Sequence, residues 1–269
     1  MKRFLLCLIL LPSQLFAGQT EEEYLLSLVR LDEMIEVVRA EGLSDNQNIP
    51  MEFFGSSFGG AWTDTLDEIF DETVLSSQIE EEFLSSFGDA PRDEILEFLE
   101  SDAWQIAVGY ELKGRVAMLD PKVEAAAIET YWQTFEKNNR RMQDLTALIE
   151  AGDLINTNVV GAMNSMYEFN LGIVSEGFDL GMSEEDILVQ IWSEEDNLRY
   201  EISEWIYSFL LLAYDPLDTD LLQAQIAFFE TPEGKRFNRA LIESFDRVYG
   251  GISFNLGAAI AILAHEQVL

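Results

Sequence analysis

The chain has 269 residues, of which 50 are acidic and 16 basic, so its formal net charge is −34 at pH 7. This charge repels nucleic acid and anionic membranes, and it argues against both as partners. Apolar residues make up 48% of the chain, which excludes a disordered acidic tail. The length suits one large domain or two domains of ordinary size.

The N-terminus has the pattern of a secretory signal peptide. Lys2 and Arg3 precede an apolar run from Phe4 to Leu11, and Ala17 before Gly18 is a suitable cleavage position. The run is too short to span a bilayer. We therefore predict that residues 1–17 are a signal peptide and that the protein is periplasmic or secreted. The alternative is a buried N-terminal helix.

Cys7 is the only cysteine, and it lies inside this apolar run. After cleavage the chain would hold no cysteine. Disulfides, thiolate nucleophiles and thiolate metal sites are then excluded, and the hydrophobic core alone must hold the fold.

Helical periodicity runs through the first half of the chain. Apolar residues from Leu25 to Val38 follow three-four spacing, and Gly42 is expected to close that helix. Residues 44–60 are rich in Gly and Phe and predict a loop or a short helix. Asp120 followed by Pro121 predicts the start of a long helix that reaches Ile149.

The second half continues the same periodicity. Gly152 is expected to be a hinge, and residues 159–180 have a helical pattern. Ser183 before three acids predicts a helix start, and Asp215-Pro216 predicts a helix end. Residues 252–263 form a final apolar segment. Since no segment has a convincing strand pattern, we predict an all-α fold of about ten helices.

An internal duplication is predicted from a shift of about 130 positions. Its anchors are Trp62 with Trp192, Phe98–Ser101 with Phe228–Thr231, and Glu41–Leu43 with Glu176–Phe178. The predicted organisation is a first helical repeat over residues 18–151 and a second over residues 152–269. Two related helical bundles would result.

The sharpest local motif is Phe229-x-Thr231-Pro232-x-Gly234-Lys235. Thr231 is expected to cap a helix with Pro232 at its first position. Gly234 would allow close packing, and Phe229 would anchor the preceding helix.

This motif resembles the signature of a family of bacterial exported, all-helical domains of unknown function. The resemblance covers Trp192 to Tyr249 well, and it implies helices and export but no catalytic residues. At the equivalent positions of the first half, only Ser101 keeps the capping chemistry, so the first copy would be degenerate.

Several chemistries lack the residues they need. His265 is the only histidine, and no Glu-x-x-His pair, Ca²⁺ loop or Gly-rich phosphate loop is present. No catalytic residue, metal site or cofactor is therefore predicted. Acid and base pairs of carboxylates remain possible, because 50 acids form many chance pairs.

The candidate partner-binding residues are Phe53, Phe54 and Phe58, which would form an exposed apolar patch unless their loop covers the core. We predict an exported, non-catalytic protein that binds a periplasmic protein partner or a small apolar ligand, at this loop or at the seam between the halves. The alternative is a carboxylate-based hydrolase. An open apolar groove would favour binding, and an enclosed cleft with two facing acids would favour the hydrolase.

Overall fold

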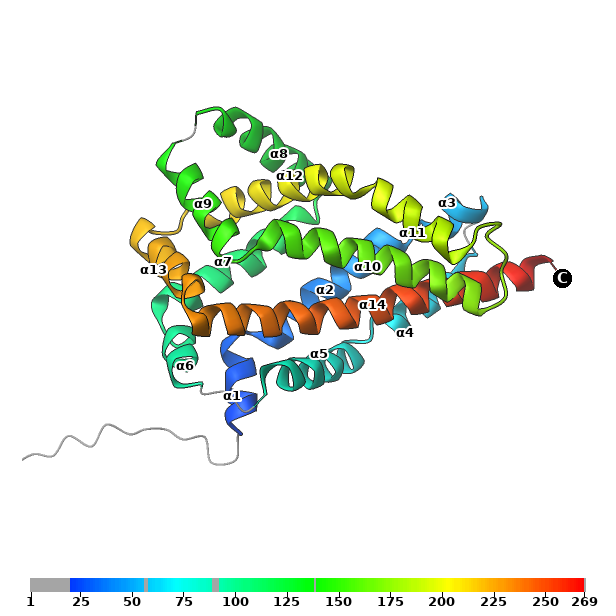
Figure 1. The fold of residues 1–269 in the computed structure, drawn as a ribbon, viewed down its shortest axis with the longest axis horizontal. Coiled ribbons are helices and arrows are strands. Elements are labelled where there is room, and N and C mark those ends of the chain that lie inside the picture. Colours follow the sequence, from blue (N-terminus) through cyan, green and yellow to red (C-terminus); the bar gives the residue numbers. More distant parts are fainter. Residues whose placement is uncertain (1–19, 56–57, 89–91, 138, 269) are drawn as a thin grey trace, which may run out of the picture.

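The computed structural model describes residues 20–55, 58–88, 92–137 and 139–268, and every regular element in these residues is an α-helix (Figure 1). The predicted all-α class is therefore confirmed. The predicted signal peptide, residues 1–17, lies outside the described residues.

Fourteen helices are formed by the described residues. Those before residue 152 are α1 (Glu21–Leu28), α2 (Leu31–Asn46), α3 (Ile49–Phe54), α4 (Gly60–Ile69), α5 (Glu72–Phe87), α6 (Asp93–Leu99), α7 (Asp102–Met118), α8 (Pro121–Phe135) and α9 (Arg140–Ala151). Those after it are α10 (Leu154–Ser175), α11 (Glu184–Ser193), α12 (Glu195–Tyr214), α13 (Thr219–Glu230) and α14 (Pro232–Val268).

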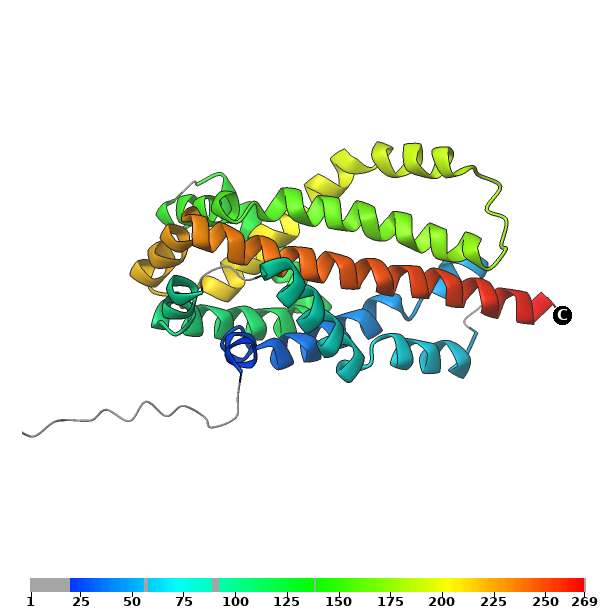
Figure 2. The same ribbon diagram turned by 60° about the horizontal axis from the view of Figure 1, so that its bottom comes forward.

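The long helices α10 and α14 form the centre of the molecule. They run side by side in both views, α14 in orange to red and α10 in green (Figures 1 and 2). Helix α5 packs against α14, while α12 packs against α10, α7 and α8. The pair of α10 and α14 therefore has helices packed on both sides.

Two glycines let α10 and α14 touch through their backbones. A Cβ atom at Gly172 would lie 2.1 Å from the carbonyl oxygen of Phe254, and one at Gly257 would lie 2.0 Å from that of Phe169. No other side chain fits at these distances, so each glycine is required by the close approach of the opposite helix.

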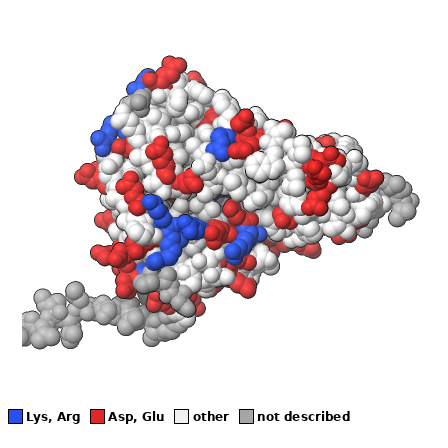
Figure 3. Space-filling model, viewed as in Figure 1, with Lys and Arg blue, Asp and Glu red and all other residues white. Residues whose placement is uncertain are grey.

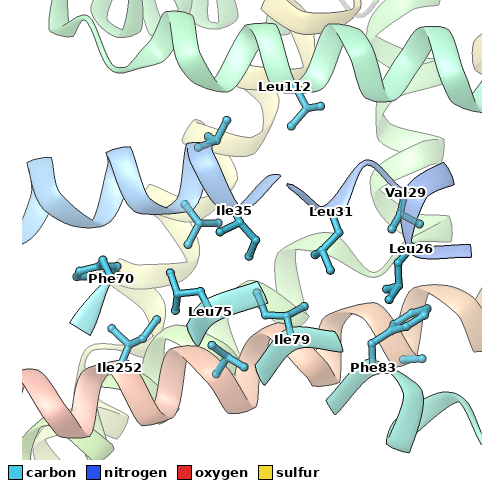
Figure 4. Packing of buried hydrophobic residues seen from close by; sticks show 14 of the residues in the cluster. Leu26, Val29, Leu31, Ile35, Phe70, Leu75, Ile79, Phe83, Leu112 and Ile252 are labelled. Carbon is cyan, nitrogen blue, oxygen red and sulfur yellow. The ribbon is translucent and has the colours of Figure 1, made fainter. Parts of the chain in front are cut away.

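Two hydrophobic clusters make up the core. In the larger one, Leu31 and Ile35 of α2 face Leu75 and Ile79 of α5, with Ile252 of α14 beside them (Figure 4). The smaller cluster joins α9, α12 and α13, with Leu145, Phe209, Tyr214 and Leu222 among its members. Both clusters contain residues from each side of Gly152. The predicted boundary at 151/152 therefore does not separate two hydrophobic cores.

Several predicted helix ends are confirmed. Ser183 caps α11 in a reciprocal pair of bonds with Asp186, and the Asp120 side chain accepts a hydrogen bond from the backbone N–H of Lys122 at 2.9 Å. Helix α12 ends at Tyr214, directly before Asp215. These ends follow from local chemistry, which explains why sequence patterns locate them.

Three predicted helices have the wrong limits. The helix expected from Leu25 to Gly42 is broken at Arg30, which has a left-handed φ of 59°, and α2 continues to Asn46. Gly42 serves packing instead, because a Cβ there would lie 2.1 Å from the Phe70 ring. The helix expected to reach Ile149 breaks after Phe135, and Asn139 caps the next one. The final apolar segment belongs to the 37-residue α14.

Helix α14 is also long and apolar enough to cross a membrane by length and composition alone. The core helix of a soluble protein can pass the same test. Here Phe237, Ile252 and Ile260 of α14 are buried in the larger hydrophobic cluster, which gives its apolar side protein partners.

The anchors of the predicted duplication lie in unequal environments. Trp62 is 2% exposed and donates a hydrogen bond to the carbonyl oxygen of Asn46, whereas Trp192 is 64% exposed. The rings of Phe98 and Phe228 stack on each other, with centroids 3.8 Å apart and an interplanar angle of 8°. The duplication stays a prediction, and its strongest anchors meet in the core.

The glycine contact between α10 and α14 predicts opposite effects at two positions of one helix. Gly257→Ala should lower the free energy of unfolding by roughly 1–3 kcal/mol, because the methyl group must push the helices apart. Gly251→Ala should leave it unchanged or raise it by up to about 1 kcal/mol, since nothing lies within 4 Å of that position and alanine favours a helix. Urea unfolding measures both. Equal stabilities for the two variants would contradict the backbone contact.

Candidate functional site

A cavity of about 570 Å³, the central cavity, is lined mainly by α2, α7, α10, α12 and α14 and is partly open to solvent. This volume is typical of small-molecule sites. Helices α2 and α7 precede Gly152 and the other three follow it, and Gly152 itself lines the wall. The cavity therefore lies at the seam between the two predicted halves.

The wall of the central cavity is largely apolar and aromatic. It includes Trp104 and Trp205, and its aliphatic and phenylalanine side chains include Val37, Val38, Val108, Leu112, Ile206, Phe209, Leu210, Phe237, Leu241 and Phe245. Such a wall favours an apolar ligand, because removing apolar surface from water gives a favourable free energy of about 25 cal/mol per Å².

Small side chains on α10 account for much of the free space. Gly161, Ala162 and Ser165 line the cavity. Further along the same helix, Gly172 brings the backbone into contact with α14. One stretch of α10 thus leaves room for a ligand, and the next closes the structure beyond it.

Hydrogen-bonded polar groups lie on the wall of the cavity next to the smaller hydrophobic cluster. The Tyr214 hydroxyl donates to the carboxylate of Glu111, and the Gln225 amide donates to the carbonyl oxygen of Ala103 at 3.0 Å. Glu111, Tyr214 and Gln225 all line the cavity. Burial raises the pKa of Glu111, and it does so against the opposing effects of the Tyr214 hydroxyl and of Arg115.

Arg115 also lines the cavity, but its charge is already balanced. Its guanidinium forms two bonds with the carboxylate of Glu41, one of them 2.9 Å from Nε to Oε1, and lies 5.9 Å from the centre of the Trp205 ring. Burial opposes the charge of Arg115, but the bonds to Glu41 outweigh this effect and raise its pKa. A ligand would therefore meet a neutral ion pair at this place.

Asp246 supplies a second carboxyl to the cavity from α14. A Cβ atom at Gly161 would lie 2.7 Å from its Oδ1, so the absence of a side chain at 161 makes room for the carboxyl. Burial raises the pKa of Asp246, and the nearby charge of Glu243 adds to this effect. Carboxyls with raised pKa values can hold a proton closer to neutral pH, and such groups gather at functional sites.

The three predicted partner-binding rings do not share one environment. Phe53 is 52% exposed, and its ring lies 5.3 Å from that of Phe169. Phe58 is half-buried and packs against the larger cluster. The Phe54 side chain lies outside the described residues. Partner binding at Phe53, Phe54 and Phe58 stays a prediction, with Phe53 as its most accessible member.

The signature motif has the local structure expected of it. The Thr231 hydroxyl accepts a hydrogen bond from the backbone N–H of Gly234 at 2.9 Å, and Pro232 begins α14. A Cβ atom at Gly234 would lie 2.0 Å from the carbonyl oxygen of Phe228. Phe229 packs against both hydrophobic clusters and lines the cavity, whereas Lys235 is exposed.

An aromatic group on α8 and α12, in which Trp132 and Tyr200 are exposed and Tyr131 is buried, did not emerge from the sequence patterns. Trp132 stacks near Tyr200 with centroids 6.3 Å apart, and Tyr131 stacks on Tyr207 at 5.5 Å. The Trp132 indole N–H donates to Glu204 at 2.7 Å. The helix pair brings together rings that lie about 70 positions apart in the chain, so no local motif contains them.

Sequence patterns also missed Glu111 and Asp246. The available signal was weak: each is an acid on a helix with some apolar neighbours, such as Val108 one turn before Glu111 and Leu112 directly after it. With 50 acids in the chain, such positions are too common to single out two of them.

Among the described residues, no group of three or more His, Cys, Asp or Glu side chains could hold a metal ion. Comparison of the chain with protein-family models, with curated proteins and with solved structures gave no match. The acids are spread over the visible face, with the basic side chains in a few groups among them (Figure 3).

The pKa of Glu111 predicts a pH-dependent effect of Glu111→Gln on stability. The native carboxyl binds its proton more tightly than the unfolded one, whose pKa is near 4.5, so the free energy of unfolding falls as the pH rises above that value. Glutamine carries no charge and can still accept from Tyr214. The variant should therefore be more stable than the wild type at pH 7, and this difference should shrink towards pH 4.

Thermal unfolding from pH 4 to pH 8 measures the effect. Glu97→Gln, on an exposed face of α6, is the matched control and should show no such gain. A Glu111→Gln protein that is less stable at pH 7 would mean that Arg115 stabilises the charged carboxylate more than burial opposes it.

Proposed function

We propose that this protein binds a small, largely apolar ligand in the central cavity without chemical turnover. The observation that carries the proposal is the cavity of about 570 Å³ with an apolar and aromatic wall. A concave space of this size with a mostly apolar wall and a few polar groups is typical of small-molecule sites. Ligand binding is therefore the function that this space serves best.

The position of the cavity supports the same proposal. Seven helices contribute to its wall, and polar groups such as Glu111, Asn238 and Asp246 occupy isolated places on it. A few polar groups on an apolar wall orient a ligand, while the wall supplies most of the affinity. The cavity also lies at the seam where sequence analysis expected a ligand.

Filling the cavity tests this function. Ala162→Phe places a ring into the free space from α10, and it should weaken binding of the neutral fluorescent probe N-phenyl-1-naphthylamine by about tenfold or more, because the two compete for one volume. Ala224→Phe, at an exposed position of α13, is the matched control and should bind the probe like the wild type. Equal probe affinities in the two variants would exclude the cavity as the binding site.

A carboxylate-based hydrolase is the second candidate, because two carboxyls with raised pKa values line the same cavity. General acid catalysis requires a carboxyl that stays protonated near the working pH. In this case the protein should hydrolyse an apolar ester such as p-nitrophenyl octanoate. Glu111→Gln and Asp246→Asn should then each lower kcat by about a hundredfold or more without weakening probe binding. If the wild type hydrolyses the ester no faster than the Glu111→Gln protein does, the hydrolase is excluded and ligand binding is the function that remains.

Export, the internal duplication and the relationship to the exported helical family complete the proposal. The resemblance of Phe229 to Lys235 to the family signature supports export and a non-catalytic role. Ser101 and Thr231 support the duplication, because each hydroxyl accepts a hydrogen bond from the backbone N–H three residues later. A periplasmic protein partner at Phe53, Phe54 and Phe58 would occupy a surface separate from the cavity.

A further inference from the structure

The charges that line the central cavity are unbalanced. Glu111 and Asp246 bring two carboxyls, whereas Arg115 is the one cationic side chain on the described wall. Tyr214 and Tyr249 are the remaining titratable groups there, and burial raises the pKa of both, so they are neutral at pH 7.

Arg115 compensates these acids only in part, because its guanidinium is bonded to Glu41 from α2 and its effect on the pKa of Glu111 is smaller than that of burial. A ligand carboxylate would add a further negative charge beside Glu41, Glu111 and Asp246. Like charges repel, and the cavity therefore disfavours anionic ligands such as fatty acids.

The two carboxyls have spare capacity as hydrogen-bond acceptors. Glu111 receives one hydrogen bond, from the neutral hydroxyl of Tyr214. Asp246 receives no hydrogen bond and forms no ion pair with any described residue, although Gly161 gives its carboxyl room beside the cavity. A carboxylate has about four acceptor positions, so both groups can accept bonds from a ligand.

We propose that the ligand of the central cavity is an apolar amine whose ammonium group is attracted by the carboxyls of Glu111 and Asp246 and donates hydrogen bonds to one of them. This inference rests on the proposed binding function and names the class of ligand. The hydrocarbon part contacts the apolar wall, and the ammonium donates charge-assisted hydrogen bonds to one of the carboxyls. Trp104 and Tyr249 also line the cavity, and aromatic rings of this kind attract a cation placed over their faces.

The charge of the whole chain favours the same ligand. A net charge of −34 attracts cations from solution and repels anions. Entry of an ammonium also places a positive charge beside two partly buried acids, so it reduces an electrostatic cost that the free protein carries.

Three ligands that share one hydrocarbon chain, octylammonium, 1-octanol and octanoate, test the charge of the head group by isothermal titration calorimetry at pH 7. Moderate salt suppresses binding to surface acids. Octylammonium should bind at least about tenfold more tightly than octanol, as expected when a hydrogen bond to a charged group replaces a neutral one. Octanoate should bind more weakly than either.

The variant Glu111→Gln/Asp246→Asn should bind octylammonium no more tightly than octanol. Its matched control, Glu97→Gln/Asp64→Asn, loses the same charge at exposed positions and should keep the wild-type preference. If the double variant fails to fold, Glu111→Gln and Asp246→Asn measured singly should each lower the preference for the amine.

The outcomes separate the two proposals. Equal affinities for octylammonium and octanol, or tightest binding of octanoate, would overturn the amine while leaving the cavity as an apolar binding site. A preference for the amine that survives in the double variant would place it on surface acids and overturn the assignment to Glu111 and Asp246. Failure of octanol and octylammonium to bind, together with failure of the fluorescent probe, would overturn the proposed function as well.

Discussion

The contact between α10 and α14 at Gly172 and Gly257 is the constraint on which the other helices depend. Each glycine admits the carbonyl oxygen of the opposite helix to about 2 Å from where a Cβ would lie. This contact sets the spacing of the two central helices, and α5 and α12 pack against the pair from either side. Because the chain has a single cysteine, it can form no internal disulfide, so this packing and the two hydrophobic clusters must supply the stability.

The same helix pair creates the cavity. Between Thr157 and Ser165, the residues of α10 that line the cavity have small or short side chains. On α14 the lining residues include Phe237, Phe245 and Asp246. Had α10 carried leucine at position 162, its side chain would occupy part of this space, whereas a side chain at position 161 would clash with the Asp246 carboxyl. The small side chains at these positions leave the volume of the apolar site free.

The polar groups of the cavity carry an electrostatic cost that the rest of the molecule avoids. Most of the acids can lie in water at little cost, yet Glu111 and Asp246 face an interior space in a chain that already has a large negative charge. Arg115 could relieve them, but Glu41 binds it. Acidic side chains in electrostatically unfavourable surroundings are typical of sites where function outweighs stability. A cationic ligand is the simplest partner that relieves both of them.

The sequence by itself determined what depends on neighbours within a few positions. It predicted the all-α class, the caps at Asp120, Ser183 and Thr231 and the helix end at Tyr214, because capping and three-four periodicity act over one or two turns. Tertiary structure alone decided the break at Arg30, the packing role of Gly42 and the meeting of Gly172 with Gly257, which lie 85 positions apart. It also chose Glu111 and Asp246 from 50 acids, since burial and a shared cavity depend on how helices distant in the chain pack together.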